Sequence, residues 1–225
     1  MQRHEPHPPS LSPRALSIAG WSAFLIAGMI FLVIAWNVLD RTAMVVLDAK
    51  LAAWLHEHGS PALTPFLLAV THLNSTVAIS IYSMVFALLL ARMREWYWIL
   101  TLALAVPGGL ALNVLFKHAY ERARPVFDKP LLELATYSFP SGHTAGAVVF
   151  YGVLAAFLVS RFYDRRRRSA CVMLAIAAVA LVAFSRLYLG AHYLSDVVAA
   201  ACASTAWLVL CLSGVHHLVR RNMRT

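Results

Sequence analysis

Three short segments of the sequence contain the residues best suited to chemistry on a phosphate group. These segments are residues 117–125, 138–143 and 185–196. Arg124 and Arg186 carry planar guanidinium groups that can donate two hydrogen bonds to phosphate oxygens, and Lys117 adds a compact positive charge. The residue types therefore predict a site in which three cations surround a phosphoryl group.

The second segment adds donors from the start of a predicted helix. Free N–H groups and the helix dipole favour an anion at such a position. Ser141 offers a hydroxyl group, and Gly142 lets the backbone approach the ligand closely. Pro140 arranges the entry of the helix. We therefore expect Ser141 and Gly142 to bind phosphate together with Lys117, Arg124 and Arg186.

Two histidines and one aspartate provide the groups needed for phosphoryl transfer. His192 and Asp196 are four residues apart, so at the start of a helix their side chains share one face. The carboxylate can hold one imidazole N–H and leave the other ring nitrogen free as a nucleophile. His143, on another helix, can protonate the departing oxygen. These roles make a complete site without a metal or another cofactor, and we expect neither.

The elements that position these residues are predicted to be helices in a membrane. The chain of 225 residues is 60% hydrophobic and 13% charged, with a mean hydropathy of +0.69, whereas soluble domains are about half apolar and a quarter charged. Long windows without charge recur, and a span needs about 20 apolar residues. Lipid-exposed backbone must also satisfy its own hydrogen bonds. The predicted fold is all-α, with six transmembrane helices at about 15–39, 62–91, 96–116, 142–160, 169–188 and 192–219.

The positive charges predict the orientation of these helices. Six spans place both termini on one side, and that side contains twelve of the nineteen Lys and Arg residues. We therefore expect cytoplasmic termini, an inner (plasma) membrane location and an active site on the extracytoplasmic face. Because the net charge of +9 is explained by topology, we expect no nucleic-acid partner.

The domain organisation follows from the same windows. Residues 1–14 and 220–225 are predicted to be cytoplasmic tails, the first of them unstructured, and residues 15–219 the six-helix transmembrane domain that contains the phosphoryl-transfer site. A short amphipathic helix at about 43–58 is expected to lie in the membrane interface. The three cysteines fall within predicted helices and are expected to be buried thiols rather than disulfides.

Several other polar residues leave more than one interpretation open. Thr71, His72, Asn74 and Ser75 interrupt the second span; interhelical hydrogen bonding is favoured over a headgroup pocket. Arg122 is expected in a solvated loop, with substrate contact as the alternative. Ser185 either supports the site or bonds within its own helix.

The order and spacing of the three segments resemble the motifs of the type 2 phosphatidic acid phosphatases, which share a core with vanadium haloperoxidases. The family pattern is Lys, six residues, Arg-Pro; then Pro-Ser-Gly-His; then Ser-Arg, five residues, His, three residues, Asp. Every position of that pattern is matched between Lys117 and Asp196. The resemblance implies that His192 forms a phosphohistidine, with Asp196 as its partner and His143 as general acid. It also implies phosphate binding by Lys117, Arg124, Ser141, Gly142 and Arg186, without a metal.

The resemblance predicts an integral membrane lipid phosphatase that acts on a lipid phosphate or pyrophosphate. Undecaprenyl pyrophosphate, converted to undecaprenyl phosphate, is the leading candidate substrate. Phosphatidylglycerophosphate, phosphatidate and lipid A phosphates remain open. One alternative is a transporter that recognises a phosphorylated lipid without cleaving it; another is haloperoxidase-like chemistry that needs bound vanadate. The sequence leaves the oligomeric state open.

Overall fold

The computed structural model describes residues 13–128, 130–132 and 134–222, and within them all regular structure is helical. The eight helices are α1 (Pro13–Leu39), α2 (Ala43–Glu57), α3 (Leu63–Leu73), α4 (Thr76–Arg92), α5 (Trp96–Tyr120), α6 (Gly142–Arg161), α7 (Arg165–Tyr188) and α8 (Leu194–Asn222). The predicted all-α membrane fold is confirmed. The predicted tails at 1–14 and 220–225 lie largely outside the described residues, since only residues 13, 14 and 220–222 of them are described, and those are helical.

Five of the described helices are long and apolar enough to cross a membrane, and α3 and α4 pass the same test only together, as a candidate sixth span that is broken and bent by 51°. The prediction of one continuous second span, at 62–91, is therefore wrong. Asn74 ends α3 and its side-chain amide donates to the Val70 carbonyl at 2.9 Å. Ser75 is extended and caps α4 by accepting the Ala78 N–H at 3.3 Å. Both side chains compete with the helical backbone for its hydrogen bonds, which explains the break.

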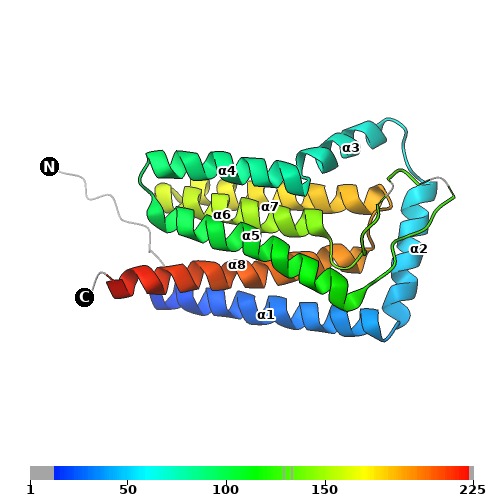
Figure 1. The fold of residues 1–225 in the computed structure, drawn as a ribbon, viewed down its shortest axis with the longest axis horizontal. Coiled ribbons are helices and arrows are strands. Elements are labelled where there is room, and N and C mark those ends of the chain that lie inside the picture. The colour runs from blue at the N-terminus through cyan, green and yellow to red at the C-terminus, as the bar shows by residue number, and fades with distance from the viewer. Residues whose placement is uncertain (1–12, 129, 133, 223–225) are drawn as a thin grey trace.

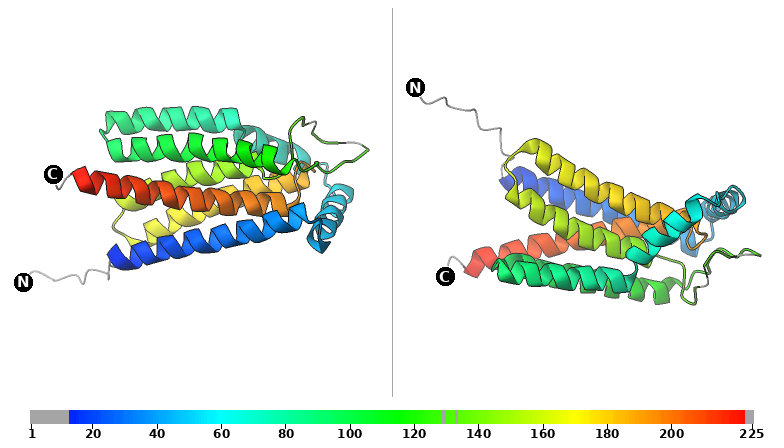
Figure 2. Two further views of the ribbon diagram at one scale, coloured as in Figure 1. Left: turned by 60° about the horizontal axis from the view of Figure 1, so that its bottom comes forward. Right: turned by 90° about the horizontal axis from the view of Figure 1, so that it is seen from above.

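The long helices run lengthwise along the molecule, and α2 lies across one end of them (Figure 1). Helix α1 packs along α8, while α6 contacts α4, α5, α7 and α8 and so occupies the middle of the bundle. The largest buried cluster is apolar and includes Ile79, Leu90, Ala105, Val149 and Val153. Figure 2 shows from two further sides that α1 begins and α8 ends far from α2.

Three helix boundaries differ from the sequence prediction, and two of them, the end of α5 and the start of α8, lie at the candidate site. Helix α5 continues to Tyr120, so Lys117 lies in its last turn. Helix α7 begins at Arg165, because the Asp164 side chain caps it by accepting the Arg167 N–H at 3.1 Å. Helix α8 begins at Leu194, so His192 precedes the helix.

Helix α2 confirms the predicted short helix at 43–58 and adds one unexpected feature. Trp54 and Leu47 are exposed, as suits a helix that lies at an interface, but Asp48 is buried. Its position relative to a bilayer stays a prediction.

The three cysteines are free thiols, as predicted. Only Cys211 is buried, whereas Cys171 and Cys202 are partly exposed on helix surfaces. The expectation that all three are buried is therefore wrong.

Candidate active site

The three predicted segments meet at the end of the bundle that α2 covers. This end is formed by the last turns of α5 and α7, the first turns of α6 and α8, and the loop at 121–140. The convergence arises because alternate helices of an up-and-down bundle end and begin at the same level.

Asp196 pairs with His192 across the start of α8. The Oδ2 atom of the fully buried Asp196 lies 3.4 Å from Nδ1 of His192 and accepts the Tyr193 N–H at 2.9 Å. It also accepts a hydrogen bond from the Ser138 hydroxyl. The predicted pairing is confirmed, but not on one helix face, because His192 lies in the preceding turn.

This arrangement keeps His192 neutral and orients its ring. Burial lowers the pKa of His192 to about 4, the nearby Arg186 and Arg124 lower it further, and Asp196 opposes them. With a proton on Nδ1 shared with Asp196, Nε2 is left unprotonated, and its lone pair faces Nη1 of Arg124. The imidazole therefore presents an unprotonated nitrogen toward Arg124 at neutral pH.

Arg124 is fixed by the loop that surrounds it. Its Nε donates to the Thr136 carbonyl at 2.6 Å, and its Nη1 donates to the Ala191 carbonyl at 2.6 Å. Nη1 also lies 3.3 Å from Nε2 of His192. Burial lowers the pKa of Arg124, which nonetheless stays charged at neutral pH. The Nη1 edge of the guanidinium is thus held beside Nε2 of His192, the candidate nucleophile.

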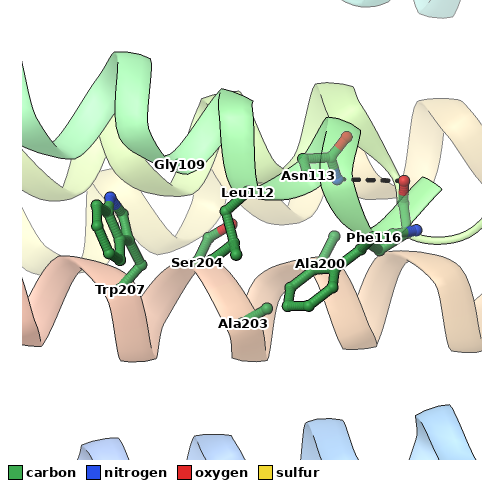
Figure 3. A pocket seen from close by; sticks show the side chains of 9 residues that line it. Gly109, Leu112, Asn113, Phe116, Ala200, Ala203, Ser204 and Trp207 are labelled. Atoms are coloured by element: carbon green, nitrogen blue, oxygen red, sulfur yellow. Dashed lines mark hydrogen bonds between the residues drawn. The ribbon is translucent and has the colours of Figure 1, made fainter. Parts of the chain in front are cut away.

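Lys117 lies beside the start of α6, with its Cε 4.0 Å from a Cβ built on Gly142. The Lys117 ammonium donates to the Tyr137 carbonyl. The Asn113 amide donates to the Pro140 carbonyl at 3.2 Å, the bond that is dashed in Figure 3. Beneath them, a small pocket between α5 and α8 is lined by Leu112, Phe116, Ala203, Ser204 and Trp207 among others. A Cβ on Gly142 would lie 3.3 Å from Oδ1 of Asn113, so glycine allows α6 to begin close to α5.

Ser141 is buried and acts as the N-cap of α6. Its backbone N–H donates to the Asp196 carbonyl at 3.1 Å, and its hydroxyl oxygen accepts from the Thr144 N–H and hydroxyl at 3.5 and 3.1 Å. The capping leaves the hydroxyl proton available, so phosphate binding by Ser141 stays a prediction. Gly142 and His143 begin the first turn and are partly exposed. His143 lies within electrostatic reach of Arg186, His192, Arg124 and Lys117.

Arg186 is a buried cation. It is 2% exposed, Nη1 donates to the Thr71 hydroxyl, and Nε has no hydrogen-bond partner among the residues that the structure describes. Within the described residues, none of Lys117, Arg124 and Arg186 forms an ion pair with a carboxylate. A buried charge in this state is unfavourable unless an anion joins it.

Four residues at the site were missed by sequence reasoning: Asp48, Arg122, Ser138 and Ser195. The expectation that Arg122 lies in a solvated loop is wrong, because its side chain is only 8% exposed and contacts both Asp48 and Asp196. Ser138 directly precedes the second motif, but its contact with Asp196 needed the tertiary structure. A carboxylate on the otherwise apolar side of α2 was the one available signal for Asp48.

The remaining polar predictions are settled by local contacts. Asn74 accepts a hydrogen bond from the Tyr151 hydroxyl at 2.8 Å and Thr71 accepts one from Arg186, which confirms interhelical bonding for these two residues, whereas Ser75 caps its own helix. Ser185 donates to the Val182 carbonyl of its own helix at 2.7 Å. In the described part of the chain, no three His, Cys, Asp or Glu side chains are grouped as metal ligands.

Comparison with known proteins connects this geometry to one family. Residues 96–220 match the family model described as the PAP2 superfamily. The chain is 34% identical over 140 residues to phosphatidylglycerophosphatase B of Bacillus subtilis (strain 168), which covers 61% of this chain and 68% of the relative. It is 26% identical over 180 residues to a probable lipid phosphate phosphatase beta of Arabidopsis thaliana, covering 70% and 84% of the two chains.

Two solved structures have the same fold. One is a crystal structure of a transmembrane PAP2-type phosphatidylglycerolphosphate phosphatase from Bacillus subtilis, with a TM-score of 0.76, 26% identity, and coverage of 88% of this chain and 96% of that chain. The other is the crystal structure of Aquifex aeolicus LpxE, with a TM-score of 0.59, 23% identity, and coverage of 74% and 95%. The second likeness concerns the fold alone.

Proposed function

Because the chain belongs to the PAP2 superfamily, we propose that it removes the terminal phosphate of a membrane lipid through a phosphohistidine on His192. Membership of this family, together with the candidate membrane spans, makes the chain a membrane lipid phosphatase.

The excess of unpaired positive charge supports this proposal most strongly. Lys117, Arg124 and Arg186 converge without a carboxylate partner in the described chain, and Nε of the buried Arg186 is unsatisfied. Asp196, the carboxylate beside them, is already bonded to His192, Ser138 and Arg122. A phosphate with two negative charges and several acceptor oxygens complements such a site.

The first chemical step uses the Nε2 lone pair of His192. Nε2 attacks phosphorus, and the bond from phosphorus to the lipid oxygen breaks. His143 donates its proton to that oxygen, so the lipid leaves as an alcohol, or as a monophosphate when the substrate is a pyrophosphate. Asp196 stabilises the positive charge that develops on the His192 ring through its contact with Nδ1.

The second step returns the protein to its starting state. His143, now neutral, takes a proton from water as the water oxygen attacks phosphorus, and the bond to Nε2 of His192 breaks. Inorganic phosphate is then released. The three cations and the α6 N-terminus stabilise the equatorial oxygens in both steps. None of these steps needs a metal ion.

For the substrate, we propose phosphatidylglycerophosphate as the first candidate. The relative that is 34% identical is named phosphatidylglycerophosphatase B, and the structure with a TM-score of 0.76 is described by the same activity. Undecaprenyl pyrophosphate is the second candidate, because it also presents a terminal phosphoryl group on a lipid anchored in the bilayer. Both leave their chains in lipid while the headgroup reaches the cations at the end of the bundle.

We also propose that the site lies on the extracytoplasmic side. Helix α1 begins and α8 ends at the end of the bundle opposite the site (Figure 1). Arg92, Arg94, Arg161 and the run 165–168 lie in the loops or helix ends of that opposite end. The distribution of basic residues favours this end as cytoplasmic. Cysteine labelling from either side of intact membranes tests this orientation.

Phosphate release from the detergent-solubilised protein tests the function. The substrates are phosphatidylglycerophosphate, phosphatidate and undecaprenyl pyrophosphate, and the comparison is between the wild-type protein and His192→Ala. We expect release by the wild type and a loss of at least about a thousandfold in the variant. Equal release by the two proteins would refute the phosphohistidine mechanism, and binding without release by the wild type would favour a lipid-phosphate transporter.

A further inference from the structure

Asp48 connects the short helix α2 to the start of α8. Its carboxylate is 4% exposed and accepts the Ser195 N–H at 3.1 Å, the Ser195 hydroxyl, and Nη2 of Arg122 at 2.9 Å. All three donors lie outside α2, in segments more than 70 residues away in sequence. The oxygens of this buried carboxylate are therefore well satisfied by donors.

Arg122 connects Asp48 to Asp196. Its Nη1 donates to Oδ1 of Asp196 and to the Ser195 hydroxyl, both at 2.6 Å. The guanidinium carbon lies 4.3 Å from the centre of the Tyr193 ring, which limits how the fork can move. Oδ1 of Asp196 is thereby occupied, and Oδ2 is the oxygen directed at Nδ1 of His192.

Asp48 also caps α8 from a different helix. The first N–H groups of a helix have no partner within it, and a capping carboxylate satisfies them. Here the Ser195 N–H is taken by Asp48, while the Tyr193 N–H is taken by Asp196 itself. The helix turn that carries Asp196 is therefore held in place by α2.

Charge gives Asp48 a second effect on the nucleophile. Asp48, Arg122 and Asp196 form a row of two negative charges and one positive charge. Arg122 without Asp48 would neutralise Asp196 and weaken its attraction for a positively charged His192 ring. With Asp48 present, the row keeps one net negative charge facing the ring that becomes cationic.

We propose that Asp48 and Arg122 are positioning residues. They fix the orientation of the Asp196 carboxylate and keep a net negative charge beside the His192 ring. The inference rests on the proposed phosphatase function. It makes α2 a part of the catalytic apparatus rather than only a helix at the interface. Because both residues act through Asp196 and the start of α8, we expect them to affect the rate of the chemical step and not phosphate binding.

The test uses Asp48→Asn, which keeps the size of the side chain and one acceptor oxygen. We expect kcat to fall roughly tenfold, within the range that contacting charge networks show, while KM and inhibition by inorganic phosphate change less than about twofold. Lys50→Gln is the matched control, since it removes an exposed charge from the same helix. We expect its kcat to equal that of the wild type.

A double variant separates charge from simple loss of structure. Arg122→Gln alone is expected to lower kcat, but in the Asp48→Asn background it should restore part of the activity, because it removes the positive charge left uncompensated. Additive losses, or a fall in thermal stability with parallel changes in kcat and KM, would overturn the proposal. If Asp48→Asn does not fold, Arg122→Gln provides the test: its kcat should fall while its KM stays close to that of the wild type.

A measurement without turnover distinguishes failure of the network from failure of the proposed function. In protein with ¹⁵N-labelled histidine, the Nδ1–H signal of His192 can be assigned by its absence from His192→Gln. Asp48→Asn is expected to move this proton signal upfield, because the hydrogen bond to Asp196 weakens. An unchanged signal would refute the network. A shifted signal in a protein that releases no phosphate would support the network and refute only the function.

Discussion

Replacing Arg186 with methionine is expected to remove activity without a large loss of stability. The Arg186 side chain is 2% exposed and has one neutral partner, Thr71, in the described chain. A buried donor without a partner, such as its Nε, costs about 1–3 kcal/mol, and the guanidinium charge adds a desolvation penalty. Methionine has a similar length and adapts to irregular space, so Arg186→Met removes the charge while filling most of the volume.

The expected change in the free energy of unfolding is the sum of two opposing contributions. Replacing a buried ion with an apolar side chain is neutral or stabilises by about 1–4 kcal/mol. The lost bond to Thr71 offsets about 1 kcal/mol of that gain. In the absence of an anion, we therefore expect the stability of Arg186→Met to lie between about 1 kcal/mol below that of the wild type and ~3 kcal/mol above it. Activity is expected to fall about 10²–10³-fold, the usual effect of removing one donor to transition-state charge.

Thermal unfolding with and without inorganic phosphate checks both parts. At a phosphate concentration about 100 times its Kd, the wild type should gain about 2.7 kcal/mol, whereas Arg186→Met should gain close to nothing if the charge is essential for binding. Thr71→Val is the matched control, since it removes the hydrogen-bond partner and keeps the cation. Two results would refute the reasoning: a variant more than about 1 kcal/mol less stable than the wild type without phosphate, or one that phosphate stabilises as strongly as the wild type.

Three further predictions concern the same site. Arg124→Lys should lower kcat about tenfold or more, because an ammonium cannot reproduce a fork held by Thr136 and Ala191; unchanged steady-state kinetics would contradict phosphate contact. Burial places the pKa of His192 near 4 rather than 6.5, so the acid limb of kcat/KM should lie close to pH 4. Because that pKa is lowered in the folded state, the stability it contributes is present above pH 6.5 and lost as pH falls toward 4, and a limb at pH 6.5 would speak against this assignment. Activity should persist in EDTA; a loss that a divalent cation reverses would show a metal-dependent site.

The spans and the central pair were predictable from sequence for physical reasons. Charged residues are too costly in lipid to occur at random, so uncharged windows mark the helices. The spacing of His192 and Asp196 allows contact in a helix or in the turn before one, so their pairing did not depend on where α8 begins. The position of Arg186 and Lys117 in last helical turns explains why all three motifs reach the same end.

Other features could not be predicted because no local pattern encodes them. The sequence around Arg122 predicts only a cation in a loop. Its partners Asp48 and Asp196 lie 74 residues before and 74 residues after it in the chain. The bend between α3 and α4 depends on whether Asn74 and Ser75 bond their own backbone or a neighbouring helix, and Asn74 does both. Hydropathy does not distinguish these two hydrogen-bonding arrangements, because the sequence window has no charged residue in either case.

The packing of α1 along α8 has a consequence for how the protein is made. Chains are synthesised from the N-terminus, so the first described helix acquires its main neighbour only when the last one is inserted. Until then Asp48 and Arg122 have been inserted without Ser195 and Asp196, their partners from α8. The packing of α1 against α8 and the assembly of the proposed catalytic pair are thus one event, and we expect no phosphate release from a chain in which α8 has not yet been inserted.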